Sequence, residues 1–389
     1  MSISTKISKF RILHLSGRGD LSGGPIVMAK LIESLPQHDH LAVYPFEGLQ
    51  DRLQDLPNCD SYHKNLHGLN PQNLFYLYRL VQANSLDLIH CHGKAAGLWG
   101  RMLGRWTGVP VVHQFHGMHW RHYPFMVQSL YFLYERWFAR WTNGFVFVSH
   151  GELDEYEQWI DQSVPGTIIP NGVSEYKDTG IERKHQLKQT LGLEPEIPVI
   201  GSITRAVYQK NLSRLLQIHG QLLLSRPAYL LLFGVRPQEL NRYDLPAGQR
   251  SFVQCLFDEQ NMEEKLQILD IYLSTSRWEG FSLGLLEAMA NKIPAILSPV
   301  TGHLDLLPLH PKGIRLVGSN SVEEYLQIIE EWLDQPALRQ EAGKVAQAYV
   351  LEKFKQQQTA EQMNEFYQNV FASLNHLYPK EQLLPDLPN

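Results

Sequence analysis

Several features that would narrow the function quickly are missing from this sequence. Cysteine is scarce: the 389 residues include three, Cys59, Cys91 and Cys255, which are widely separated. Such a set supports neither a disulfide framework nor a CxxC metal site, and it favours a reducing compartment. An Asp-x-Asp pair, a frequent metal-binding arrangement, is also absent.

Long apolar runs and a strong charge imbalance are missing as well. No apolar run reaches the roughly 18 residues of a membrane span. The segment 1–16 has no apolar region followed by a small-residue cleavage site, and it leads directly into a predicted strand. A net charge of -5 argues against bulk attraction to nucleic acid or anionic lipid. We therefore expect a protein that remains in the cytoplasm.

The composition that is present is that of an ordinary globular protein, with 43% hydrophobic and 19% charged residues. Because 389 residues are many for one core, we expect two domains. Strand-like and helix-like segments alternate along the chain, which predicts an α/β fold with parallel sheets. The sequence becomes polar after Val173, so we predict domains at 1–173 and 174–354, followed by a helix and a loose tail at 355–389.

The most informative stretch is Asp270–Pro294. An apolar strand is followed by a loop at 274–280, a helical pattern in LGLLEAMA, and a second strand at 295–297. This order predicts one βαβ unit of a parallel sheet.

Two carboxylates in this unit, Glu279 and Glu287, have seven residues between them. Glu279 should follow the strand, and Glu287 should face the same crevice from the helix, where open α/β sheets bind ligands. The amides of Phe281, Ser282 and Leu283 would form the helix N-terminus, which suits a phosphate. The alternative is that both glutamates are simply solvated.

The segment EGFSLGLLEAMANKIPAILS closely resembles the donor-binding segment of retaining glycosyltransferases of the GT-B type, family four. The resemblance implies two Rossmann-like domains facing across a cleft, with a C-terminal helix that crosses back onto the first. It places Glu279 beside the donor sugar and Glu287 on the ribose hydroxyls.

A pair of cations follows the strand predicted at Pro198–Ile203. Arg205 and Lys210 lie on a loop from which both can reach one diphosphate, although solvated side chains are the alternative. The segment is similar to the family signature G-R-L-x-x-x-K-G. Thr204 and Asn211 replace its two glycines, which predicts a stiffer loop.

The first half offers a glycine-rich turn and a histidine-rich segment. By resemblance, Gly23 and Gly24 lie near the donor phosphates and the acceptor, and a structural turn is the alternative.

His113, His116, His119 and His122 recur every third residue. A metal site is disfavoured because the pattern crosses a strand, a glycine and a proline. The resemblance instead implies that His116 touches the sugar hydroxyls or the leaving phosphate, and a packed histidine is the alternative.

Three further segments complete the sequence. The resemblance places the nucleobase against the backbone at 253–256, where Cys255 replaces a common glycine. Gly302 and His303 occupy a family loop to which we assign no role. The helix predicted at Pro124–Arg140 is apolar on nearly every side. It is therefore either buried in the core, which we favour, or exposed to a membrane through residues 120–140.

Together these features predict a retaining transfer of a hexose from a nucleotide diphosphate sugar, with a UDP-sugar favoured, to a glycan or lipid-linked hydroxyl. The departing diphosphate oxygen could itself take the acceptor's proton. Because no Asp-x-Asp motif is present, we expect no required metal ion, and we expect no cofactor. Cell-surface polysaccharide synthesis, with peripheral contact at the inner face of the plasma membrane, fits the resemblance. The alternatives are an epimerase or phosphorylase on the same fold, or a non-catalytic binding protein.

Overall fold

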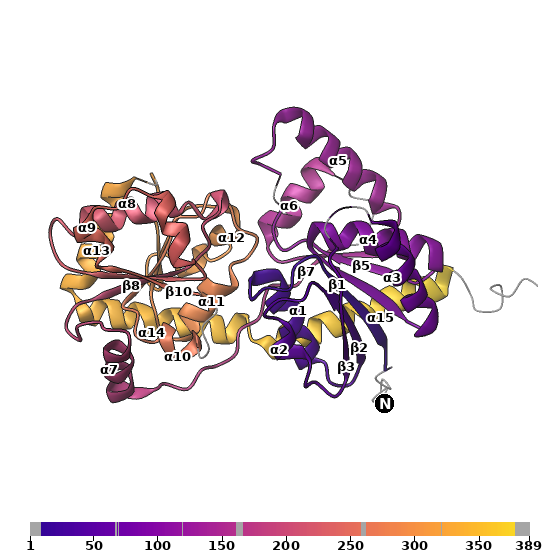
Figure 1. Ribbon diagram of the computed structural model, residues 1–389, viewed down its shortest axis with the longest axis horizontal. Coiled ribbons are helices and arrows are strands. Elements are labelled where there is room, and N and C mark those ends of the chain that lie inside the picture. Colours follow the sequence, from indigo (N-terminus) through magenta and orange to yellow (C-terminus); the bar gives the residue numbers. More distant parts are fainter. Residues whose placement is uncertain are drawn as a thin grey trace, which may run out of the picture. The chain divides into compact units, whose positions relative to one another are not determined.

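The computed structural model describes residues 9–66, 68, 70–118, 120–160, 166–257, 262–319 and 321–377. The chain forms two compact units (Figure 1). The described residues up to 148, those at 152–170 and those from 356 onward form the first unit. The second unit contains residues 149–151 and 171–355. The chain therefore leaves the first unit after residue 170 and returns to it at 356.

The first unit is built on a seven-stranded parallel sheet with the order β3-β2-β1-β4-β5-β6-β7. Its strands are β1 (Arg11–Ser16), β2 (Asp39–Tyr44), β3 (Cys59–His63), β4 (Leu88–His92), β5 (Val111–Gln114), β6 (Gly144–Phe147) and β7 (Gly166–Ile168). The strand order reverses between β1 and β4, which pair with His14 opposite His90. The sequence predicted most of these strands, but it gave no signal for β3, a half-exposed edge strand.

Helices cover both faces of this sheet because successive apolar side chains of its strands point to opposite faces, and each face has a core of its own. The helices are α1 (Gly23–Ser34), α2 (Gln50–Leu53), α3 (Pro71–Ala83), α4 (Gly93–Thr107), α5 (Phe125–Ala139), α6 (His150–Trp159) and α15 (Gln356–Leu377). Leu13 and Leu15 pack with α3 and α4, whereas Ile12 packs with α1 and α15.

The C-terminal helix α15 belongs to the first unit although the second unit precedes it in the chain (Figure 1). The Nδ1 atom of His90 lies 2.7 Å from the Tyr367 hydroxyl, and the Nε2 atom of His38 lies 2.8 Å from the Asn364 amide oxygen. The predicted crossing of the terminal helix back to the N-terminal domain is thus confirmed. The predicted tail after 377 lies outside the described residues.

The second unit has a six-stranded parallel sheet with the order β10-β9-β8-β11-β12-β13. Its strands are β8 (Val199–Ile203), β9 (Tyr229–Phe233), β10 (Val253–Leu256), β11 (Ile271–Ser274), β12 (Ala295–Leu297) and β13 (Ile314–Leu316). Its helices are α7 (Gly180–Thr190), α8 (Leu212–Leu222), α9 (Ala247–Arg250), α10 (Met262–Leu266), α11 (Leu283–Ala290), α12 (Thr301–Leu304), α13 (Val322–Asp334) and α14 (Pro336–Lys353). Short 3₁₀ turns lie at η1 (Tyr208–Lys210), η2 (Pro237–Arg242) and η3 (Leu307–Leu309).

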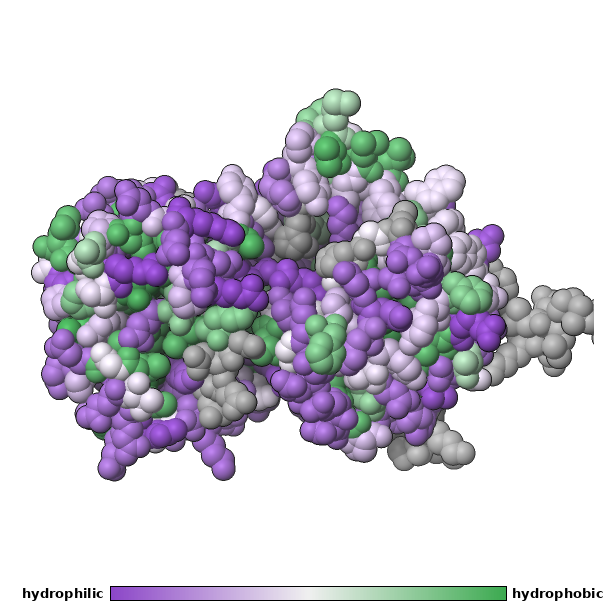
Figure 2. All heavy atoms as spheres, viewed as in Figure 1, coloured by the Kyte–Doolittle hydropathy of each residue, from purple (hydrophilic) through white to green (hydrophobic). Residues whose placement is uncertain are grey.

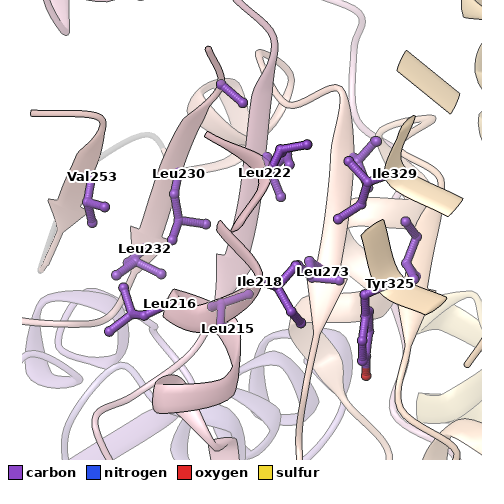
Figure 3. Close-up of a cluster of buried hydrophobic side chains, with 14 of the residues drawn as sticks. Leu215, Leu216, Ile218, Leu222, Leu230, Leu232, Val253, Leu273, Tyr325 and Ile329 are labelled. Atoms are coloured by element: carbon purple, nitrogen blue, oxygen red, sulfur yellow. The ribbon is translucent and has the colours of Figure 1, made fainter. Parts of the chain in front are cut away.

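The core of the second unit lies between its sheet and helices α8 and α13 (Figure 3). Leu230, Leu232 and Leu273 point from the strands toward Leu215 on α8 and Ile329 on α13. Apolar spacing at i, i+3 and i+4 gives α8 this buried stripe. The two parallel sheets confirm the predicted α/β class.

The long apolar helix α5 is mostly exposed, so the favoured expectation of core burial is wrong for most of it. Within this helix, Tyr131, Glu135 and Ala139 are buried, and they follow one another at intervals of four residues. The opposite side exposes Met126, Leu130, Leu133 and Trp137. Figure 2 shows hydrophobic side chains gathered where Figure 1 places α5. Among the described helices, none is long and apolar enough to cross a membrane.

One buried ion pair attaches α5 to α4. The Nη1 atom of Arg101 donates to Oε2 of Glu135 over 2.7 Å, and both side chains are at most 1% exposed. Removing one partner of a buried pair leaves an uncompensated charge in a medium that solvates it poorly.

We therefore expect Glu135→Ala to lower the free energy of unfolding by about 3–5 kcal/mol, because the Arg101 guanidinium loses its counter-charge. The joint replacement of Arg101 by Met and Glu135 by Leu should recover most of that loss. Arg183→Ala removes the exposed pair with Glu264 and serves as the control, with an expected loss below about 1 kcal/mol. Denaturant titration of the three variants measures this, and equal losses in the first and third would contradict it.

Candidate functional site

The loops that carry the predicted cations and the first glutamate meet where the second sheet reverses its strand order. β8 and β11 are neighbours, and the chain continues outward from them in opposite directions. Loops at the carboxyl ends of two such strands diverge and leave a crevice for a ligand. Arg205 and Lys210 follow β8, and Glu279 follows β11. The topology therefore brings these predicted residues to one edge of the sheet.

An ion pair between a partly buried lysine and a buried glutamate lies at this edge. The Lys210 ammonium is 2.6 Å from Oε1 of Glu279, and the Ser276 hydroxyl donates to the same oxygen over 2.5 Å. Burial acts to raise the pKa of Glu279, but the Lys210 charge, the nearby His303 and the two hydrogen bonds outweigh it and hold this pKa below its ordinary value. Glu279 is consequently an anion at neutral pH and a hydrogen-bond acceptor.

Backbone hydrogen bonds fasten the two loops together. The Arg277 amide donates to the Gln209 carbonyl over 2.7 Å, and the Gln209 side chain donates to the Trp278 carbonyl over 3.0 Å. Asn211 adopts a left-handed backbone conformation with φ of 52°. Glycine reaches this region freely and asparagine tolerates it, which explains why a glycine is common where Asn211 stands.

The third predicted element of the site is the N-terminus of α11, which follows Glu279 in the chain. Ser282 is its N-cap, and its hydroxyl accepts from the Leu285 amide over 3.4 Å. The buried side chain of Asn171 donates to the Phe281 carbonyl over 2.6 Å and fixes the turn. Leu283 starts the helix and is buried.

Two residues of this region were not identified as site residues from the sequence. Burial raises the pKa of Tyr272 on β11, and the charges of Glu279 and Glu287 add to the effect. His303 on α12 is fully buried, and its Nδ1 lies 2.8 Å from the Ser298 carbonyl. Burial lowers the pKa of His303 even though the Glu279 carboxylate opposes it. The sequence contained one signal for this position, the neighbouring Gly302. A glycine is required there because a side chain would collide with the Gly280 carbonyl.

Cys255 lies on β10, two strands away from β8. It pairs with Leu232 of β9, and burial raises the pKa of its thiol to about 11. The structure therefore does not bring Cys255 to the Lys210–Glu279 pair.

In the first unit, the predicted residues meet at that sheet's own reversal point. Gly23 and Gly24 begin α1 after β1, and a Cβ on Gly24 would lie 3.5 Å from Cδ2 of His116. His116 has φ of 58° just after β5. His113 instead packs against Gly97 of α4, on the other face of the sheet. His119 lies outside the described residues.

Imidazoles are concentrated on the α1 face of this sheet. Among the residues that the structure describes, His14, His90 and His92 are the group whose ligand atoms lie close enough together, within 4.8 Å, to hold a metal ion. All three are buried. The Lys210–Glu279 site of the second unit is not part of this group.

The Lys210–Glu279 pair should make the stability of the protein depend on pH. A carboxyl whose folded pKa is depressed contributes stability that is present above its unfolded pKa and is lost as the pH falls through the folded pKa. The wild type should therefore lose stability below the ordinary carboxyl value of 4.5 as Glu279 becomes protonated.

In Lys210→Met, burial without a counter-charge should raise the pKa of Glu279, so the variant should be least stable relative to wild type at neutral pH and approach it in acid. Lys312→Met, at an exposed position, is the matched control. Melting temperatures from pH 4 to 8 measure the effect. A constant difference between Lys210→Met and wild type over this range would contradict it.

Comparison with known proteins identifies relatives across nearly the whole chain. A 26% identical galactosyltransferase from Escherichia coli, named UDP-Gal:alpha-D-GlcNAc-diphosphoundecaprenol alpha-1,3-galactosyltransferase, matches over 85% of this chain and 90% of its own length. An N-acetylgalactosaminyltransferase from Campylobacter jejuni, whose name specifies a diacetylbacillosaminyl-diphospho-undecaprenol acceptor, is 23% identical over 68% of this chain and 74% of its own length.

Solved structures share the fold. Sucrose-phosphate synthase from Thermosynechococcus elongatus superimposes with a TM-score of 0.79 at 19% identity, covering 94% of this chain and 100% of the other. The Anabaena protein HepE, solved with UDP and glucose, gives 0.78 at 18% identity, covering 92% and 100%. Residues 23–175 match the model of Glycosyltransferase Family 4, and residues 183–349 match that of Glycosyl transferases group 1. The chain therefore belongs to the family 4 (group 1) glycosyltransferases of GT-B fold.

Proposed function

We propose that this glycosyltransferase moves a hexose from a UDP-sugar to a hydroxyl of a saccharide carried on a polyprenyl diphosphate, with retention and without a metal ion. The observation that carries the proposal is the partly buried Lys210–Glu279 pair beside the N-terminus of α11, at the reversal point of the second sheet. A nucleotide diphosphate sugar has the groups that this site suits: two phosphates for cations and amides, and hydroxyls for carboxylates.

The donor assignment also draws on the relatives. HepE was solved with UDP and with UDP-glucose, and the Escherichia coli relative is named for UDP-Gal. Arg205 and Lys210 would neutralise the diphosphate of such a donor, with the amides around Ser282 as further donors. Glu287, on α11, would accept from the ribose hydroxyls.

Glu279 is best suited to hold the sugar and not to act as an acid. Its depressed pKa keeps it ionised, so it accepts hydrogen bonds from hexose hydroxyls. Lys210 would then be shared between Glu279 and the phosphate that departs. The departing oxygen takes the acceptor's proton on the same face of the sugar, and the cations stabilise the charge that develops there.

The stereochemistry of a relative's reaction supports retention. The bond from sugar to phosphate in UDP-galactose is α, and the relative that uses this donor is named for an α-1,3 product. An α product from an α donor requires overall retention. Nothing in this scheme needs a protein nucleophile, in contrast to the paired carboxylates of retaining glycosidases.

A lipid-linked acceptor gives the exposed helix α5 a role. Two relatives are named for diphosphoundecaprenol-linked acceptors, which are anchored in a membrane by their prenyl chain. We propose that Phe125, Met126, Leu130, Leu133 and Trp137 rest in the membrane interface while the acceptor's sugars reach the site. These side chains are 53–81% exposed, which is unfavourable in water and favourable at an interface.

The rival functions differ in what they consume. An epimerase would alter the donor without any acceptor, a phosphorylase would require free phosphate, and a binding protein would hold the nucleotide without turnover. The proposed transferase should release UDP only when the lipid-linked acceptor is present.

For the donor site, we expect Glu287→Gln to weaken UDP binding about 10–100-fold, because hydrogen bonds to a charged group contribute roughly 1.5–3 kcal/mol. Glu279→Gln should leave UDP affinity within about threefold and lower turnover of UDP-galactose or UDP-glucose. Titration calorimetry with UDP and an assay of UDP release, both with a chelator present, measure these effects.

Glu196→Gln, at an exposed position of the same unit, is the control and should match wild type. An absence of binding by UDP and by UDP-, GDP- and ADP-sugars would refute the transferase assignment. Full loss of activity in the chelator would refute metal independence, and a β-linked product would refute retention.

For the membrane role, we expect the joint replacement of Leu130 and Leu133 by Glu to reduce partitioning onto anionic phospholipid vesicles more than tenfold. Each leucine loses roughly 1.5–3 kcal/mol of apolar burial. Leu224→Glu, which changes an 80% exposed leucine in the second unit, is the matched control. Co-sedimentation measures partitioning, and UDP affinity should be the same in all variants. Equal partitioning of the double variant and the control would contradict a membrane role for α5.

A further inference from the structure

Four histidines of the first unit form a continuous hydrogen-bonded chain. His40 on β2, His14 on β1, His92 on β4 and His116 after β5 lie on the face of the sheet that α1 covers. Nδ1 of His40 is 3.0 Å from Nε2 of His14, Nδ1 of His14 is 3.1 Å from Nε2 of His92, and Nδ1 of His92 is 3.2 Å from Nε2 of His116. Each contact joins the Nδ1 of one ring to the Nε2 of the next.

The far end of the chain fixes the direction of every bond in it. Nε2 of His40 lies 3.0 Å from the Leu35 carbonyl oxygen, which has lone pairs and no proton. His40 must therefore carry its proton on Nε2. In a neutral ring its Nδ1 is then an acceptor, so Nε2 of His14 must donate to it. The same step repeats through His14 and His92.

The rings of His40, His14 and His92 are neutral at physiological pH. Burial lowers the pKa of His40 to about 4, and it lowers the pKa values of His14 and His92 well below their ordinary range. The positive charge that each ring would place on its neighbours adds to the effect for His14 and His92. Each ring therefore has one N–H group and one lone pair, as the directional argument requires.

We propose that His40, His14 and His92 are positioning residues that hold His116 in the tautomer with its proton on Nε2. Whatever contacts Nδ1 of a neutral His116 must then donate a hydrogen bond to it. A hydroxyl of the transferred hexose can do this, whereas an oxygen of the diphosphate cannot. This inference rests on the proposed function, and it selects the sugar hydroxyl from the two contacts that the family resemblance allows for His116.

A metal ion held by His14, His90 and His92 is the rival explanation for so many buried imidazoles. Hydrogen bonding accounts for more of the geometry, because both ring nitrogens of His14 and of His92 already lie within 3.2 Å of a partner atom. A metal between these two rings would replace their mutual hydrogen bond. The direction of hydrogen bonding that the Leu35 carbonyl sets would then not extend beyond His14.

The tautomer can be read directly from the protein. Long-range proton–nitrogen spectra of the full chain with ¹⁵N-labelled histidine distinguish protonated from unprotonated ring nitrogens. Two other buried histidines provide internal references: Nε2 of His219 faces the Ala228 carbonyl, and Nδ1 of His303 faces the Ser298 carbonyl. His116 should show the pattern of His219. The pattern of His303, or a stoichiometric metal ion in the purified protein, would overturn the proposal.

Variants at His92 separate positioning from simple packing. In His92→Leu the acceptor for the His116 proton is lost, so the tautomers should mix. In His92→Gln the side-chain oxygen can still accept, so the His219-like pattern should persist. Affinity for UDP-galactose or UDP-glucose should fall roughly fivefold in His92→Leu and recover in His92→Gln, as expected for one neutral hydrogen bond.

Binding of UDP alone is the control, because UDP has no hexose. It should be unchanged in both variants, and an equal loss for UDP and the UDP-sugar would mean that His116 contacts the diphosphate, contrary to the proposal. If wild type binds no nucleotide, the proposed function and the hydroxyl contact both fail. The spectra then still decide whether the histidine chain sets the tautomer of His116.

Discussion

The candidate site depends on one constraint of parallel sheets, the reversal of strand order. A strand's carboxyl end opens into a crevice only where the chain winds outward in opposite directions from two neighbouring strands. Each sheet of this protein has one such place, between β1 and β4 in the first and between β8 and β11 in the second. The glycine turn and His116 lie at the first, and the Lys210–Glu279 pair lies at the second.

The Lys210–Glu279 pair and the histidine chain stabilise their polar groups by different means. In the second unit, opposite charges compensate one another, and Ser276 satisfies the same carboxylate oxygen. In the first unit, the rings of the histidine chain stay neutral, because burial disfavours the charged imidazole, and the Nδ1 of each ring from His40 onward accepts a hydrogen bond from the next ring. The arrangement of charge is appropriate to the proposed chemistry, since a diphosphate requires cations and a sugar hydroxyl can be held by a neutral acceptor.

The sequence predicted local structure well where side chains carry a strong pattern. Buried strands such as β9 are continuous apolar runs, and the αβ alternation was visible from them. β3 was missed because its residues are polar and half exposed at a sheet edge. Helix α5 was predicted correctly as a helix, but the expectation that it is buried in the core was wrong for most of it. Apolar residues on nearly every side do not reveal which side meets the core, and in the structure that side carries Tyr131, Glu135 and Ala139.

What the sequence determined by itself was the class of fold, the order of the loops and the chemical types at their ends: Arg205, Lys210, Glu279 and Glu287. These follow from local pattern and from resemblance to a family. The tertiary structure alone decided that Lys210 pairs with Glu279, 69 positions away, and that His303 lies beside that pair. It also decided that His14, His40, His92 and His116 form one chain. Such contacts join strands that are distant in sequence, so they depend on strand order and register, which no local pattern of residues encodes.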